Sequence, residues 1–297
     1  MTGPQTEPLN VIELAALASR AQKRIQSLAF GDRKVWVKKA VKQLHPGHYA
    51  HAAMSIVLPR SIYRPSPPEV GEAASRGEAQ RLRAFQAKGI DVPDLLYEGA
   101  GLLVLGDCGP TVERRLKEFR SQGDAVAHDA LLVAMAHGMA AVHAAGLVHG
   151  RPHPRDMFLR EGRVGFMDFE QNPLRAMSLV RAQARDALFL FGFIADLAMM
   201  PETPMRAWEA WASRAPAETR RQLDRTLRGM KPFMAVGRLA ARVKLGSDLR
   251  RFLAGTGFLS KVPSNSEEKS RGGLQAVKSA AATPLAGKMN GNDHRSR

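Results

Sequence analysis

The stretch from His149 to Glu170 constrains this chain more than any other part of the sequence. It opens with a His-Gly pair and a loop rich in Pro and Arg, and it closes with a run in which Val164, Phe166 and Asp168 occupy alternate positions. That alternation predicts a short strand with Asp168 at its end. A carboxylate there is costly to bury unless it binds a cation or joins a hydrogen-bond network. Of these two interpretations we favour the metal site.

A second group of candidate residues lies earlier in the chain. Two short β-like runs, 25–30 and 35–37, flank a Gly-Asp turn and predict a hairpin whose second strand ends in Lys38. Residues 72–88 predict a helix, because apolar residues recur on one face and a glycine follows. Glu78 lies on that apolar face, where a carboxylate needs a partner.

The remaining elements follow from local patterns. The apolar run 102–105, bounded by glycines, predicts a buried strand, and a stripe at helical spacing over 131–142 predicts a long helix. Helices are expected from 174 to about 258. The Pro-rich segment 63–68 predicts a loop, and 264–297, rich in Ser, Gly, Ala, Lys and Asn, predicts a disordered basic tail.

Composition indicates a globular protein in a reducing compartment. The chain has 297 residues, of which 44% are hydrophobic, enough for a substantial core. Its single cysteine, Cys108, excludes an intramolecular disulfide. The longest apolar stretch, 187–200, is short for a bilayer span and carries Asp196, which favours a buried helix. We therefore expect a cytoplasmic protein.

The charge of the chain favours anionic partners. Its formal net charge is +16, and most of that excess lies before residue 264. Nucleotide phosphates, a phosphorylated glycolipid, the inner membrane surface and nucleic acid all fit this charge. Nucleic acid is the weakest of these candidates, because no segment interleaves basic and aromatic residues and one cysteine permits no zinc finger.

The order of these elements is that of a bilobal kinase-like fold. Over residues 25–186 the chain resembles the atypical bacterial kinases related to lipopolysaccharide-core sugar kinases and to RIO-type and aminoglycoside-phosphotransferase-like enzymes. The resemblance implies an α+β fold with a small antiparallel-sheet lobe (1–107), a larger helical lobe (108–263) and nucleotide between them. The segments that carry it are Val35–Lys38, Gly77–Leu82, His143–Gly150 and Met167–Glu170.

The resemblance also implies roles for individual residues. Lys38 would contact nucleotide phosphates and Glu78 would orient it through an ion pair, while Asp168 would bind metal. Asp156 stands where such kinases have an Asn that ligates the second metal, and it keeps an oxygen ligand. The implied cofactors are ATP and Mg²⁺ or Mn²⁺. The alternative for Lys38 and Glu78 is an ordinary solvated strand and a surface carboxylate.

Arg151 departs from the pattern, because it stands where these kinases carry the catalytic Asp. A guanidinium stays protonated and accepts no proton. Three interpretations stay open: another carboxylate such as Asp156 is the base, Arg151 stabilises phosphate charge, or the protein binds without transferring. The phosphate loop departs too, since no Gly-x-Gly pattern precedes Lys38.

Two further residues receive structural roles. We interpret His149 as a packing residue, and we expect Asp186 to anchor the backbone of the catalytic loop.

Three hypotheses result. The first is an ATP-dependent phosphotransferase acting on a sugar hydroxyl of an anionic glycolipid, or on a protein Ser or Thr, near the inner membrane surface. The second is a pseudokinase that acts as a binding or regulatory module, because Arg151 replaces the catalytic Asp. The third, a basic nucleic-acid-binding helical protein, leaves the ordered carboxylates unexplained.

Overall fold

The computed structural model describes residues 11–40, 69–240 and 247–262. The chain divides into two compact units, 1–262 and 263–297, and every described residue belongs to the first. The loop predicted at 63–68 and the tail predicted from 264 onward lie outside the described residues. The lobe boundary predicted at residue 107 stays a prediction.

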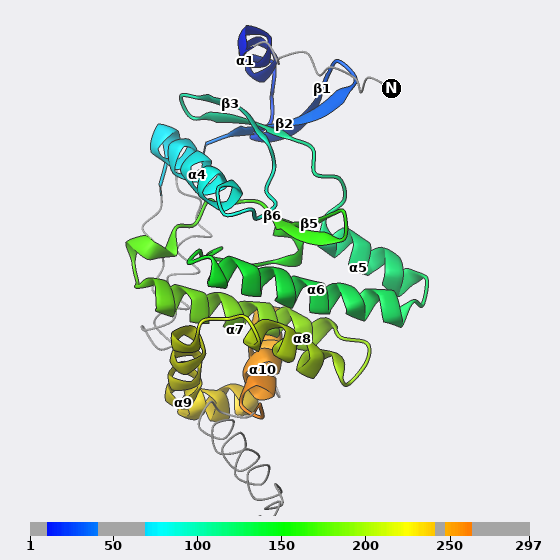
Figure 1. Cartoon of the computed structure of the whole chain (residues 1–297), viewed down its shortest axis with the longest axis vertical. Coiled ribbons are helices and arrows are strands. Elements are labelled where there is room, and N and C mark those ends of the chain that lie inside the picture. The colour runs from blue at the N-terminus through cyan, green and yellow to red at the C-terminus, as the bar shows by residue number, and fades with distance from the viewer. Residues whose placement is uncertain (1–10, 41–68, 241–246, 263–297) are drawn as a thin grey trace, which may run out of the picture. The chain divides into compact units, whose positions relative to one another are not determined.

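A four-stranded antiparallel sheet and one long helix make up the first part of the described chain (Figure 1). The elements are α1 (Val11–Ser19), β1 (Ile25–Phe30), β2 (Arg33–Lys39), α4 (Gly71–Gln86), β3 (Leu95–Gly99) and β4 (Leu102–Gly106). The strands lie in the order β1-β2-β4-β3. Phe30 pairs with Arg33, and Gly31 between them has φ 59°, a value that glycine adopts without strain. The predicted hairpin is therefore confirmed.

The two faces of β2 have different surroundings. Val35 and Val37 are buried in a small cluster with Leu14 of α1. Successive side chains of a strand point to opposite faces, so Lys38 lies on the other side of the sheet. That side faces α4, whose buried residues include Glu78 and Phe85. The alternation of β2 thus directs Lys38 toward the helix that carries Glu78.

Helix α4 packs on the segment that leads to Asp168. It begins one residue before and ends two residues before the predicted helix 72–88. The ring of Phe85 lies 6.4 Å from that of Phe166 and 4.5 Å from that of Phe169. Aromatic contacts at these distances fix the helix against the candidate site.

Helices dominate the rest of the described chain, as predicted (Figure 1). The elements are α5 (Val112–Ser121), α6 (Ala125–Ala144), the 3-10 turn η1 (Pro154–Asp156), β5 (Met157–Arg160), β6 (Arg163–Phe166), the 3-10 turn η2 (Pro173–Arg175), α7 (Leu179–Leu197), α8 (Thr203–Ala212), α9 (Ala217–Ala240) and α10 (Ser247–Leu259). Leu131, Met135, Met139 and Val142 of α6 are all buried, which confirms the predicted stripe. A small antiparallel sheet with a larger helical part is the predicted α+β class.

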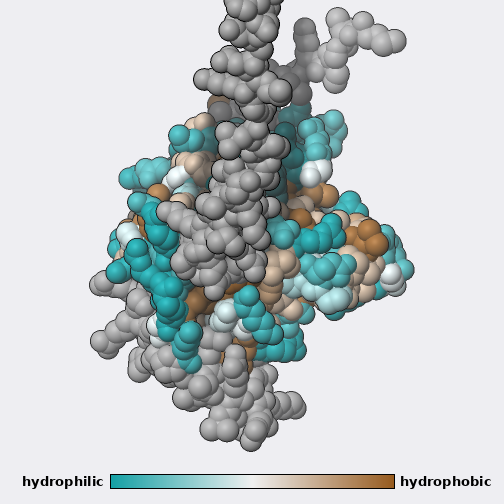
Figure 2. Space-filling model, turned by 60° about the horizontal axis from the view of Figure 1, so that its bottom comes forward, coloured by the Kyte–Doolittle hydropathy of each residue, from teal (hydrophilic) through white to brown (hydrophobic). Residues whose placement is uncertain are grey.

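Helices α6 and α7 each contain an apolar stretch, so we consider whether either could cross a membrane. The apolar part of α7 is buried at Ala187, Leu188 and Ile194, which confirms the prediction of a buried helix. Helix α6 is long and apolar enough to cross a bilayer, but half of its most apolar stretch is buried, and core helices can have the same length and composition. Figure 2 shows a mostly hydrophilic surface on the side of α9 and α10, where hydrophobic residues form small separate groups.

Candidate functional site

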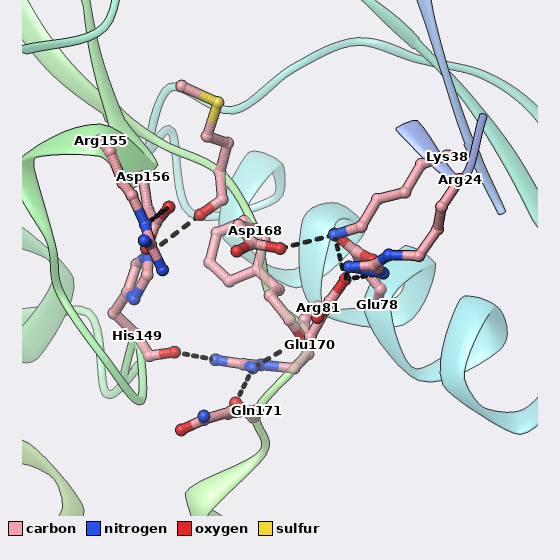
Figure 3. Close-up of polar contacts among 12 residues, drawn as sticks. Arg24, Lys38, Glu78, Arg81, His149, Arg155, Asp156, Asp168, Glu170 and Gln171 are labelled. Atoms are coloured by element: carbon pink, nitrogen blue, oxygen red, sulfur yellow. Dashed lines mark hydrogen bonds and ion pairs between the residues drawn. The ribbon is translucent and has the colours of Figure 1, made fainter. Parts of the chain in front are cut away.

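Lys38 is the centre of a cluster of ionic contacts (Figure 3). Its Nζ lies 2.8 Å from Oε1 of Glu78, 2.6 Å from Oδ1 of Asp168 and 3.1 Å from Oε1 of Glu170. Lys38 and Glu78 are buried, at 8% and 4% exposure. Three carboxylates around one ammonium leave a net negative charge, which favours a further cation nearby. The sequence-predicted residues Lys38, Glu78 and Asp168 thus come together.

Lys38 and Asp168 are held in their ionised forms, whereas burial raises the pKa of Glu78 above its usual value. Burial disfavours the Lys38 ammonium, but Glu78, Asp168 and Glu170 outweigh burial and raise the pKa of Lys38. Burial likewise opposes ionisation of Asp168, but the adjacent Lys38 ammonium lowers the pKa of Asp168 below its usual value. Asp168 is therefore an anion at neutral pH, as a metal ligand must be.

The backbone at Asp168 is unusual. Strand β6 ends at Phe166, and Asp168 has φ 65°, in the left-handed region that few residues other than glycine adopt. Met167 N donates to the carbonyl oxygen of Asp156 at 2.9 Å and so joins the Asp168 segment to η1. Strained residues of this kind cluster at functional sites.

Asp156 lies in η1 and is almost fully buried, at 6% exposure. Burial and the negative charge of Asp168 raise the pKa of Asp156 to about 7, against the opposing effect of Arg155 and Arg151. Nε of Arg155 lies 3.3 Å from Oδ1 of Asp156. The two predicted metal ligands are therefore close enough for the charge of Asp168 to influence the ionisation of Asp156.

Arg151 contributes positive charge to this side of the site. It is half-buried, and its guanidinium lowers the pKa values of both Asp156 and Asp168. Within the part of the chain that the structure describes, no acidic side chain forms an ion pair with Arg151. A guanidinium in this state can bind an added anion such as a phosphate.

Asp186 of α7 anchors the loop that carries Arg151, which confirms the prediction. Its carboxylate accepts hydrogen bonds from His149 N at 2.6 Å and Gly150 N at 2.9 Å. Gly150 has φ 104°, and an added Cβ would lie 2.7 Å from the carbonyl oxygen of Gln171. Only glycine fits this turn.

His149 is a packing residue, in agreement with its interpretation. Its ring lies 5.7 Å from the Phe166 ring and 5.2 Å from the Phe169 ring. Its Nε2 lies 3.1 Å from the carbonyl oxygen of Met167. Complete burial lowers the pKa of His149 to about 4, so the ring is neutral at physiological pH.

Arg81 of α4 holds together the two loops of the site, and sequence reasoning gave it no role. Its guanidinium donates to the carbonyl oxygens of Val148 at 2.8 Å, His149 at 2.6 Å, Phe169 at 3.0 Å and Gln171. Burial lowers the pKa of Arg81 to about 10. Its position three residues after Glu78, on the same helical face, was the available sequence signal.

Arg24 and Glu170 were also missed as site residues. Nη1 and Nη2 of Arg24 lie 2.9 Å and 2.8 Å from Oε1 of Glu170, the oxygen that also contacts Lys38. Glu170 directly follows the Asp168-Phe169 pair, which was a sequence signal for its position. Nothing in the sequence indicated that Arg24 would reach it.

The donor set fits a metal ion that arrives with a nucleotide. Among the described residues, no group of three or more His, Cys, Asp or Glu side chains could hold a metal ion by itself. Mg²⁺ in nucleotide sites is usually held by one or two carboxylates, with phosphates and water as its other ligands. Asp156 and Asp168 provide such a pair.

Comparison with known proteins gives the family. No curated protein matches the sequence. The structure is similar to a solved structure of WaaP in complex with acyl carrier protein, with a TM-score of 0.46 and 15% sequence identity over 78% of this chain and 93% of that chain. The sequence model of the lipopolysaccharide kinase (Kdo/WaaP) family matches residues 19–190, more than half of the chain, including every predicted site residue. The chain therefore belongs to the lipopolysaccharide kinase (Kdo/WaaP) family of kinase-like phosphotransferases.

Proposed function

We propose that this protein is an ATP-dependent phosphotransferase that uses Mg²⁺ or Mn²⁺ to phosphorylate a sugar hydroxyl of an anionic glycolipid. The observation that carries the proposal is the buried contact of Lys38 with Glu78 at 2.8 Å and with Asp168 at 2.6 Å. A lysine oriented by a helix glutamate beside a metal-binding Asp is the arrangement that kinase-type phosphoryl transfer requires.

Each residue of the site has a separate role in this proposal. Lys38 binds nucleotide phosphates, and Glu78 keeps the ammonium in place. Asp168 and Asp156 would hold a divalent cation, which would neutralise charge on the phosphates. Arg151 stabilises negative charge on the transferred group, because its guanidinium has no acidic partner within the described residues.

Asp156 is the best candidate for accepting the proton of the acceptor hydroxyl. Without a cation its pKa is about 7, and a bound cation would lower this value, so the carboxylate would be ionised and able to accept a proton at neutral pH. The loose transition state of phosphoryl transfer depends mainly on positioning and cations, so the change to Arg151 is compatible with turnover.

We infer the acceptor of the phosphoryl group and the location of the protein from the family and from the net charge of the chain. The family name points to a lipopolysaccharide acceptor, and the net charge of +16 suits a phosphorylated glycolipid at the cytoplasmic surface of the inner membrane. Each basic residue near an anionic surface contributes about 1 kcal/mol. A protein Ser or Thr is the second acceptor to test.

Arg151 supports a second candidate function, that of a pseudokinase. A protein that keeps Lys38, Glu78 and Asp168 but has no catalytic carboxylate at position 151 would bind MgATP without transferring its phosphoryl group. Such a protein would act through a partner whose recognition depends on the bound nucleotide.

The first experiment is thermal unfolding with ATP, with Mg²⁺, and with both, alongside transfer of labelled phosphate from ATP to purified lipopolysaccharide. A ligand at 100 times its Kd stabilises the native state by about 2.7 kcal/mol. We expect a metal-dependent shift and transfer in the wild type. Both should be lost in Asp168→Asn and retained in Asp32→Asn, a matched change at an exposed turn residue.

The results separate the candidates. Binding and transfer support the phosphotransferase. Binding without transfer to lipopolysaccharide or to protein supports the pseudokinase. The absence of any ATP-dependent shift at saturating concentration would exclude both.

A further inference from the structure

A single carboxylate oxygen bridges two cationic side chains at the edge of the site. Oε1 of Glu170 lies 3.1 Å from Nζ of Lys38 and 2.8 Å from Nη2 of Arg24 (Figure 3). Arg24 directly precedes β1, and Lys38 lies near the end of β2. Both side chains therefore contact the same negatively charged oxygen, that of the Glu170 carboxylate.

The segment that carries Arg24 is held in place by the strand beside it. Lys39 N donates to the carbonyl oxygen of Arg24 at 2.7 Å, and Nζ of Lys39 donates to the carbonyl oxygen of Ala21 at 2.6 Å. Oε1 of Gln26 accepts from the backbone N of Gln22 and Lys23 at 2.9 Å and 3.1 Å. The loop before β1 is thus an ordered, basic connection, and Arg24 is fixed at its end.

The ion pairs of Lys38 are not equivalent. Glu78 has a side-chain exposure of 5%, whereas Glu170 and Arg24 have side-chain exposures of 37% and 42%. Exposed ion pairs contribute little to stability, and loss of a buried partner is strongly destabilising. Asp168 has a similar side-chain exposure of 32%, but it lies closer to Nζ of Lys38, at 2.6 Å against 3.1 Å for Glu170. Glu170 is therefore the carboxylate that a competing anion displaces most readily.

We propose that Arg24 and Lys38 together bind a phosphate group of the nucleotide, and that Glu170 occupies this position in the free protein. A phosphate offers the same kind of charged oxygen, and the planar guanidinium of Arg24 can bind two phosphate oxygens. Arg24 thereby takes over part of the role of a glycine-rich loop, since only Gly3 and Gly31 precede Lys38. The inference rests on the proposed nucleotide site.

The test is calorimetric titration of the full-length protein with MgATP and, separately, with adenosine. We expect Arg24→Gln to weaken MgATP binding about tenfold, as loss of a bidentate phosphate contact does. Glu170→Gln removes the competitor and should tighten MgATP binding several-fold. Adenosine has no phosphate, so its affinity should be the same in all variants.

Two controls carry the same charge changes at exposed positions. Arg33→Gln lies at the exposed first residue of β2, in the same hairpin, and Glu209→Gln lies on α8. Both should leave MgATP affinity unchanged. If Arg24→Gln does not fold, Arg24→Lys keeps the charge and removes the bidentate geometry, and a smaller weakening is then expected.

Each outcome has one meaning. Failure of the wild type to bind MgATP removes the proposed function itself. If the wild type binds MgATP and Arg24→Gln behaves as Arg33→Gln does, only the Arg24 inference is overturned. Weaker binding of MgATP by Glu170→Gln would show that Glu170 assists the metal or the fold, which also overturns the displacement.

Discussion

Around Lys38 every carboxylate is paired with a cation, whereas the half-buried Arg151 has no acidic partner among the described residues and the buried Asp156 makes a longer contact of 3.3 Å with Arg155. The first region holds Lys38 against Glu78 at 2.8 Å. The second holds Asp156, whose pKa is raised to about 7, and a guanidinium without an acidic partner in the described part of the chain. Under the proposed function, nucleotide binding and phosphate transfer therefore depend on different parts of the site and can be lost separately.

We expect the largest loss of stability from a substitution of Lys38. Lys38→Met leaves the buried Glu78 carboxylate without its cation, which should lower the free energy of unfolding by about 3–5 kcal/mol and abolish MgATP binding. Chemical denaturation measures the first effect and calorimetry the second. Lys88→Met, at an exposed position of the turn after α4, is the control and should change neither. Equal behaviour of the two variants would contradict the central role of Lys38.

A change at Asp156 should separate transfer from binding. Asp156→Asn restores the amide that kinase loops carry at this position, so MgATP binding should persist. Loss of a general base typically lowers turnover about 10²–10⁴-fold. Phosphate transfer and calorimetry on the same preparation decide this. Unchanged transfer would show that Asp156 acts as a metal ligand only.

A change at Arg81 should loosen both loops of the site, because Arg81 of α4 donates hydrogen bonds to carbonyl oxygens in each of them. Arg81→Lys keeps the charge but leaves the carbonyl oxygens of Val148 and His149 without donors, for an expected loss of about 2–3 kcal/mol. Hydrogen exchange should increase in the loops at 148–150 and 169–171. The control Arg83→Lys, on the exposed face of α4, should leave this exchange unchanged. A uniform increase over the whole chain would indicate general unfolding instead.

The smallest effect concerns acid stability. His149 has a pKa of about 4 in the folded protein and an ordinary value near 6.5 when unfolded, so the unfolded state binds the proton first as the pH falls. His149 should contribute nothing to the pH dependence above about pH 6.5 and a loss of about 2 kcal/mol by pH 5. His153, whose pKa is also lowered to about 4, adds to this fall, and Asp156, whose pKa is raised to about 7, opposes it. The comparison of wild type with His149→Asn isolates the His149 contribution, which the variant should lose. The exposed residue His137, changed to Asn, should keep it.

The sequence was sufficient for features that depend on order and spacing. The hairpin before Lys38, the helix that carries Glu78 and the strand that leads to Asp168 each follow from a local pattern, and the structure contains all three. Their meeting followed from the family resemblance. No local pattern could show it, because Lys38 and Asp168 are separated by 130 residues.

Features that depend on burial and on long side chains were not predictable. The raised pKa of Asp156 arises from its burial next to Asp168, which no local pattern specifies. Arg81 and Arg24 are two among 44 basic residues, and only the folded chain selects their partners. Arg24 lies outside the segments that carry the family resemblance, and Arg81 lies within Gly77–Leu82 but at a position to which the resemblance assigned no role.

The four carbonyl oxygens bound by Arg81 limit how this protein can be regulated. Many kinases are switched by movement of the helix that carries the Lys-pairing glutamate. Here that helix could move away only if the hydrogen bonds to both loops broke together, with buried oxygens left unpaired. The helix and the loops are therefore expected to behave as one rigid body, and control of activity has to act on the more exposed contacts beside Lys38.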